Sequence, residues 1–126
     1  MITPKQFSSH LICPAGSPIL SDGRLRQELT LYNVSADSMP SLLAELADLT
    51  GKSLTPDSPV STLSGGQKVL LMCLLALHSP TRYILFIDLW HNLDACNRDR
   101  IKTLLQSYGN DRQIAFQDTP HVDPRG

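Results

Sequence analysis

The chain has 126 residues, of which 41% are hydrophobic and 18% charged, and its formal net charge at pH 7 is −1. This length suits one modest domain. The 11 basic residues are scattered and balanced by 12 acidic ones, which gives no reason to expect nucleic acid or an anionic membrane as a partner. The three cysteines lack metal-binding or CxxC spacing, which indicates a reducing compartment. With no signal peptide visible, and with Val69–Leu77 too short to span a bilayer, we expect a cytoplasmic protein without direct membrane insertion.

Three elements are predicted in the first half of the chain. Leu11–Cys13 is apolar and ends at a proline, which is typical of a short strand. Arg24–Tyr32 and Pro40–Thr50 carry leucines at helical spacing, so each is expected to form a helix with one buried face.

Gly51-Lys52-Ser53 matches the end of the phosphate-binding pattern GxxxxGK[ST], but its surroundings contradict that reading. Leu46 stands where the first glycine of the pattern belongs. A predicted helix precedes the triplet where the pattern needs a strand, and two prolines follow where it needs a helix. We therefore interpret Gly51 as the end of the preceding helix.

The stretch Leu63-Ser64-Gly65-Gly66-Gln67 leads directly into the predicted helix Lys68–His78. Ser64 can cap this helix, and the two glycines allow a backbone or a ligand to approach closely. Free N–H groups and the positive end of the helix dipole make such a start a site for a phosphate. The alternative interpretation is a capped helix after a glycine-rich turn, with no ligand.

The second half of the chain reads as strand, helix and strand. Tyr83–Ile87 is an apolar run closed by Asp88, which suits a buried parallel strand with a site at its carboxyl end. Asp94 precedes the predicted helix Ala95–Tyr108, and Gln113–Phe116 is predicted to be a short strand.

This order of motifs resembles the C-terminal part of the nucleotide-binding domain of ATP-binding cassette (ABC) ATPases. LSGGQ would be their signature motif, Ile84–Asp88 the Walker B strand, and Asn92-Leu93-Asp94 the D-loop. Pro18–Leu29 also resembles a segment of exporter-type ABC domains, which favours a transporter relative over a DNA-repair relative.

The resemblance implies an α/β fold, namely a truncated P-loop NTPase with a helical subdomain and a short parallel sheet flanked by helices. Within one partial domain, residues 20–78 would form the helical signature subdomain. Residues 79–119 would form the α/β part with the Walker B strand and the D-loop, and residues 120–126 would form a tail.

Several catalytic parts of the family are absent from this sequence. There is no glycine loop with its lysine, and Leu89 stands where the family has its catalytic glutamate. The glutamine of the Q-loop would fall near Ala15 or Gly16, and the switch histidine near Asp118. His121 lies close by, but we interpret it as a solvated residue of the tail. We therefore expect the chain to be inactive as an ATPase on its own.

What is kept is the set that, in the family, acts on the nucleotide of the partner domain. By resemblance, the residues expected to contact ATP held by a partner are Ser64, Gly65, Gly66, Gln67 and Asp94. Asp88 would reach Mg²⁺ through a water molecule. The implied partners are a complete or complementary ABC ATPase half and a membrane permease, which would link the chain peripherally to the inner membrane.

Two alternatives stay open from the sequence. The chain could be a non-catalytic interaction or regulatory protein on an ABC scaffold, or a remnant or split-gene half whose P-loop lies elsewhere. Without the missing half, Tyr83–Ile87 would be an exposed hydrophobic edge strand, and such edges invite self-association or an obligate partner. An independent enzyme is disfavoured, because none of the four histidines lies near Ser64 in sequence.

Overall fold

The computed structural model describes residues 10–19, 23–91, 93–108 and 111–119, and its elements match those predicted from the sequence. Each predicted helix and strand is present, with boundaries that differ by at most three residues. In chain order the elements are β1 (His10–Pro14), α2 (Leu25–Leu31), α3 (Met39–Thr50), the 3-10 turn η1 (Val60–Thr62), α4 (Gly65–His78), β2 (Tyr83–Ile87), α5 (Ala95–Tyr108) and β3 (Gln113–Gln117).

The three strands form one parallel sheet in the order β1-β2-β3, in which Ile84 lies beside Leu11 on one side and Ile114 on the other. Our expectation that Tyr83–Ile87 is an exposed edge strand is therefore wrong. Both of its edges are hydrogen-bonded, because the short segments predicted before and after it pair with it in register. The α/β class with a short parallel sheet is confirmed.

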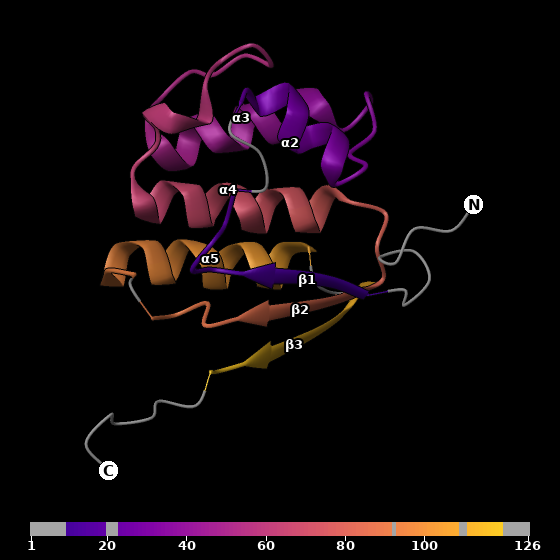
Figure 1. Cartoon of the computed structure of the whole chain (residues 1–126), viewed down its shortest axis with the longest axis vertical. Helices are drawn as coiled ribbons and strands as arrows, with labels where there is room; N and C mark the ends of the chain where they lie inside the picture. Colours follow the sequence, from indigo (N-terminus) through magenta and orange to yellow (C-terminus); the bar gives the residue numbers. More distant parts are fainter. Residues whose placement is uncertain (1–9, 20–22, 92, 109–110, 120–126) are drawn as a thin grey trace.

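Helix α4 is the centre of the molecule. Every residue from Val69 to Leu77 is buried, as expected for a helix covered on all sides. Helix α3 packs on one side of α4, α5 packs on another, and β1 also contacts α4. All the helices lie to one side of the strands in Figure 1, with α2 and α3 beyond α4 as seen from the sheet.

The opposite face of the sheet is less protected within the described residues. Ile12, Leu85 and Ala115 lie side by side in the register of the three strands. The Ile12 side chain is 55% exposed, whereas its neighbours in β1, Leu11 and Cys13, are buried against the helices. An apolar surface thus remains open on this face.

Helix α3 ends as predicted at Gly51, whose φ of 72° is the left-handed conformation that glycine adopts at helix ends. Its N–H donates to the Ala47 carbonyl at 2.8 Å, which completes the last turn. The segment is therefore a helix terminus, and the phosphate-loop reading of Gly51-Lys52-Ser53 fails. Among the described residues, no helix combines the length and the apolar character needed to cross a bilayer.

Candidate functional site

The LSGGQ stretch forms a capping box at the start of α4. Ser64 Oγ accepts a hydrogen bond from the Gln67 N–H at 3.2 Å, and Gln67 Oε1 accepts one from the Ser64 N–H at 3.0 Å. These reciprocal bonds satisfy two backbone donors that a helix start otherwise leaves unpaired. They also explain why α4 begins at Gly65, three residues before the predicted start at Lys68.

Two backbone donors remain at this helix start. In the part of the chain that the structure describes, neither the Gly65 nor the Gly66 N–H has a hydrogen-bond partner. Ser64 and Gly65 are exposed, and a Cβ added to Gly65 would meet nothing within 4 Å. The start of α4 is therefore open to solvent and presents two free donors at the positive end of the helix dipole.

Gln67 also anchors the signature loop to α3 through a residue that the sequence analysis did not assign to the site. Lys52 Nζ donates to Gln67 Oε1 at 3.0 Å and to the Thr62 carbonyl at 2.6 Å. Gln67 Nε2 donates to the Thr50 carbonyl at 3.4 Å. The Gln67 side chain thus has a structural function, and its contact with nucleotide stays a prediction. Nothing in the sequence pattern singles out Lys52 for this bond.

Asp94, the last residue of the predicted D-loop, begins α5 beside the LSGGQ stretch. Asp94 Oδ1 accepts a hydrogen bond from the Asn97 N–H at 2.7 Å, which is the bond of an N-terminal cap. A Cβ on Gly66 would lie 2.6 Å from Asn97 Nδ2, so this glycine lets the starts of α4 and α5 touch. Asn92, the first residue of the predicted D-loop, lies outside the described residues. The structure therefore brings Ser64, Gly65, Gly66 and Asp94 together at one end of two neighbouring helices.

At the end of β2, Asp88 is bound to the segment that follows β3. Its Oδ1 accepts from the Thr119 N–H at 2.6 Å, and its Oδ2 accepts from Thr119 Oγ1 at 2.7 Å. These bonds lower the pKa of Asp88, which keeps it ionised. Its φ of 56° is uncommon for a residue other than glycine, and such strain is often found at functional sites.

Leu89, at the position where the sequence resemblance expects a catalytic glutamate, is only 2% exposed. It lines a cavity of about 110 Å³ together with Ala15, Gly16 and residues of α4 and of the loop after β2. Ala15 and Gly16, the predicted Q-loop positions, thus lie close to the end of β2. This cavity has an apolar wall where catalysis would need a side chain that orients water.

Two residues of this region were not recognised as site residues from the sequence. His91 Nε2 lies 3.7 Å from Asp88 Oδ1 and 3.6 Å from Asp118 Oδ1. The Trp90 ring packs against Phe116, with ring centroids 5.9 Å apart, which gives Trp90 a structural explanation that the sequence lacked. His121, the other histidine considered for this region, lies outside the described residues.

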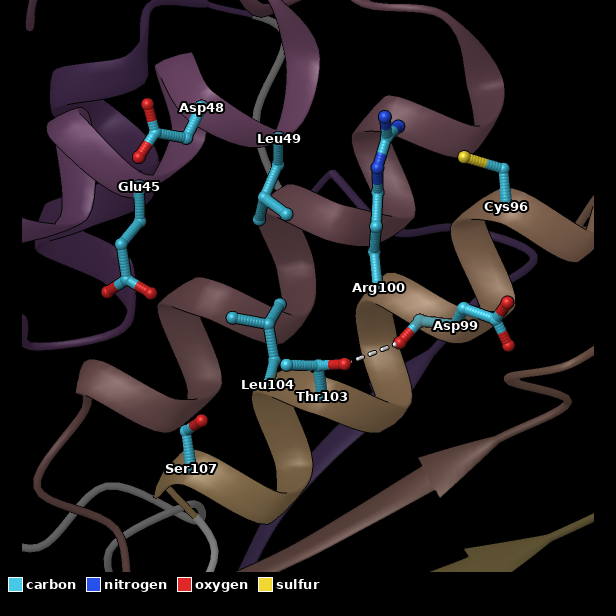
Figure 2. Close-up of a pocket in the computed structure, with 9 residues that line it drawn as sticks. All are labelled: Glu45, Asp48, Leu49, Cys96, Asp99, Arg100, Thr103, Leu104 and Ser107. Atoms are coloured by element: carbon cyan, nitrogen blue, oxygen red, sulfur yellow. Dashed lines mark hydrogen bonds between the residues drawn. The ribbon is translucent and has the colours of Figure 1, made fainter.

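A separate cavity of about 430 Å³ lies between α3 and α5 (Figure 2). Glu45, Asp48 and Leu49 line it from α3, and Cys96 and Arg100 are among its residues from α5. At one end of the cavity Glu45 accepts a hydrogen bond from the Tyr108 hydroxyl and lies 3.3 Å from His78 Nε2. It contains none of the predicted site residues.

No protein-family model and no curated protein matches the sequence. The fold, in contrast, has clear neighbours among solved structures. An ABC transporter ATP-binding protein from Pyrococcus furiosus superposes with a TM-score of 0.65 at 12% identity, over 98% of this chain and 64% of that one. A metal-chelate type ABC transporter in an inward-facing conformation gives a TM-score of 0.62 at 17% identity, over 87% and 47% of the two chains. A bacterial Atm1-family ABC exporter with ATP bound gives 0.64 at 16% identity, over 87% and 21%.

These identities show the fold alone, and the chain spans less than two thirds of the length of each of these neighbours. The shared architecture covers nearly all of the 126 residues, including the helical part and the parallel sheet. The chain therefore has the α/β fold of the ATP-binding proteins of ABC transporters.

Proposed function

We propose that this chain acts as a degenerate ABC-type ATP-binding subunit that presents its signature loop to ATP held by a partner ATPase. The observation that carries this proposal is the open start of α4, where the N–H groups of Gly65 and Gly66 have no partner among the described residues. A phosphate oxygen could accept both hydrogen bonds and a third from Ser64 Oγ.

The magnitudes favour a shared nucleotide over one bound by this chain alone. A hydrogen bond to a charged group contributes about 1.5–3 kcal/mol. Two or three such bonds, reduced by the cost of association, correspond to millimolar affinity or weaker. Tight binding needs the P-loop and its lysine, which these 126 residues do not contain, so a partner would supply them together with most of the Mg²⁺ ligands.

The residues present fit ATP and Mg²⁺ only in part. The signature end fits a phosphate because it combines free donors with solvent access. At the Walker B end, Asp88 retains a carboxylate that is 25% exposed, and a water-mediated contact with Mg²⁺ is proposed for it. Leu89 fits no catalytic step, so hydrolysis by this chain is not proposed.

Nuclear magnetic resonance of the isolated chain tests the phosphate contact directly. We expect inorganic tripolyphosphate to shift the amide signals of Gly65 and Gly66 at millimolar concentration. The Ser64→Asp variant can still cap the helix but repels an anion, so it should lose the response. The Ser107→Asp variant is a matched control, because Ser107 is exposed on α5 and lies outside the signature loop. Unchanged glycine signals, or an equal response in Ser64→Asp, would contradict the proposal.

A second experiment addresses the partner. A P-loop-bearing ABC ATPase from the same source, mixed with this chain, should form a complex that requires Mg-ATP and is lost in Ser64→Arg. A complex that forms equally without nucleotide, and that survives this substitution, would instead favour the non-catalytic interaction protein.

The open face of the sheet favours a related second candidate, a split-gene half. Ile12 is 55% exposed within an apolar row formed by the three strands. A complementary P-loop half would cover this row and also contribute the nucleotide. Co-purification with such a half, weakened by Ile12→Lys and unaffected by Ser64→Arg, would support this second candidate.

A further inference from the structure

Asp88, His91 and Asp118 form a cluster of possible metal ligands at the carboxyl end of the sheet. Each offers one ligand atom, and these atoms all lie within 4.8 Å of one another. Asp88 comes from the end of β2, His91 from the loop that follows, and Asp118 from the residues after β3.

The loop that carries His91 is held by its own contacts. The His91 N–H donates to the Asp88 carbonyl at 3.3 Å, so both residues belong to one tight turn. Arg98 Nη2 donates to the Trp90 carbonyl at 3.0 Å, and the Trp90 ring packs against Phe116 of β3. These contacts hold the imidazole beside the end of β3.

A junction between the end of β2 and the residues after β3 positions the two carboxylates. Thr119 donates through its N–H and its hydroxyl to the two oxygens of Asp88, which joins the end of β2 to the residues after β3. Asp118 is next to Thr119 in the chain, so this junction also brings its carboxylate to His91, where Oδ1 lies 3.6 Å from Nε2. The cluster therefore depends on sheet pairing and needs no long flexible side chain.

We propose that Asp88, His91 and Asp118 bind a divalent transition-metal cation of the zinc class. Zinc–nitrogen and zinc–oxygen bonds measure about 2.0–2.2 Å, so two ligands of a tetrahedral ion lie about 3.4 Å apart. The separations of 3.6 and 3.7 Å from His91 Nε2 to the two carboxylate oxygens are close to that value. Small side-chain movements would bring all three atoms to bonding distance.

Several properties of the cluster favour a metal site over a simple ion pair between the histidine and the carboxylates. One imidazole nitrogen with two carboxylate oxygens is a ligand set suited to zinc, cobalt or nickel, whereas Mg²⁺ prefers oxygen ligands and retains its water. His91 and Asp118 are 49% and 72% exposed, so water can complete the coordination. Each Asp88 oxygen keeps a second lone pair after bonding to Thr119.

A bound ion would cross-link the loop after β2 to the residues after β3. This site is separate from the signature loop and shares only Asp88 with the Mg²⁺ contact proposed above. The inference does not rest on the proposed function, because His91 and Asp118 have no part in it. A metal here would have a structural role, because it would stabilise the junction between these two segments. The buried Leu89 beside Asp88 offers no group that could orient a nucleophile, so no catalytic role is proposed for the ion.

Calorimetric titration of the 126-residue chain with ZnCl₂, in the presence of millimolar Mg²⁺, tests the site. We expect one Zn²⁺ per chain, and at least a tenfold loss of affinity in His91→Gln and in Asp118→Asn, since loss of even an outer-shell partner typically costs 10- to 100-fold. The Asp99→Asn variant, which removes an exposed carboxylate of α5 outside the cluster, should bind like the parent chain.

Cobalt(II) absorption separates this site from the exposed thiol of Cys96. The proposal expects a Co²⁺ spectrum without a thiolate band, unchanged in Cys96→Ser and lost in His91→Gln. Circular dichroism of the metal-free variants must show an unaltered fold. The proposal is overturned if His91→Gln binds Zn²⁺ as tightly as the parent chain, if binding follows Cys96 or His121 instead, or if Mg²⁺ competes equally.

Discussion

The start of α4 and the end of β2 lie at the same edge of the molecule, but they differ in the groups that they present. Val69 of α4 and Asp88 after β2 line one cavity, so the two regions are neighbours. At the start of α4, two backbone donors face solvent without partners among the described residues. At the end of β2, a buried leucine fills the position expected for the catalytic acid.

The difference has a physical origin. The donors at the start of α4 are backbone N–H groups, which any helix presents as long as its first turn is capped and its entrance is clear. The capping box of Ser64 and Gln67 therefore holds the helix start in the conformation that the proposed phosphate contact requires. A catalytic carboxylate is one side chain, and a single substitution removes it while the apolar replacement adds to the core.

The largest effect is expected from restoring an acid at the end of β2. Leu89→Glu places a carboxylate in a site that is 2% exposed, which should lower the free energy of unfolding by about 2–4 kcal/mol and restore no hydrolysis. Leu89→Met is the control, with an expected loss below about 1.5 kcal/mol. Urea denaturation measures both, and a stable Leu89→Glu chain that hydrolyses ATP would refute the comparison.

A smaller effect is expected at the cap of α4. Ser64→Ala removes the acceptor for the Gln67 N–H and should destabilise the chain by about 1 kcal/mol. Ser61→Ala, at an exposed position of the η1 turn, should stay within about 0.5 kcal/mol of the parent chain. Equal stability of the two variants would mean that the capping box does not hold the signature loop.

The two glycines of the signature should respond differently to alanine. Gly65→Ala adds a methyl group into open space within a helix, so it should stabilise the chain by up to about 1 kcal/mol while it weakens the response to tripolyphosphate. Gly66→Ala meets Asn97 Nδ2 at 2.6 Å and should be less stable than Gly65→Ala. Thermal unfolding ranks the variants, and the reverse order would contradict the packing described here.

Tyr108, at the end of α5 away from the two regions compared above, provides a control. Its ionisation should not respond to substitutions in either region. Burial and the hydrogen bond to Glu45 raise the pKa of Tyr108 to about 12. The unfolded tyrosine ionises near pH 10, so the folded state binds more protons between these values, and stability should fall as pH rises through this window. Tyr108→Phe should lose less stability than the parent chain between pH 10 and 12, which denaturation at each pH would measure.

Much of this arrangement could be predicted from the sequence, for identifiable reasons. Helix α5 was predicted with its observed limits, because Asp94 caps its start and its leucines keep helical spacing. The predicted limits of the strands were nearly correct, but the predicted position of β2 at an edge of the sheet was wrong. Pairing between residues 73 positions apart leaves little trace in local patterns, so the segment Leu11–Cys13 was not recognised as the neighbour of β2.

The local geometry of the candidate site was predictable where it follows from neighbouring residues and was missed where it depends on tertiary contacts. The capped helix start at the LSGGQ stretch follows from a five-residue pattern with a known physical meaning, whereas its contact with nucleotide stays a prediction. The bond from Lys52 to Gln67, and the approach of His91 to Asp118, join residues 15 and 27 positions apart in the chain. Neither pair has a spacing that indicates contact, and sheet pairing and helix packing create both.

Calorimetric titration of the isolated chain with Mg-ATP, followed by an assay of phosphate release on the same sample, shows whether this chain needs a partner to bind and hydrolyse ATP. We expect binding no tighter than millimolar and no release of phosphate above the protein-free rate. Micromolar affinity together with turnover by this chain alone would show that no partner is needed.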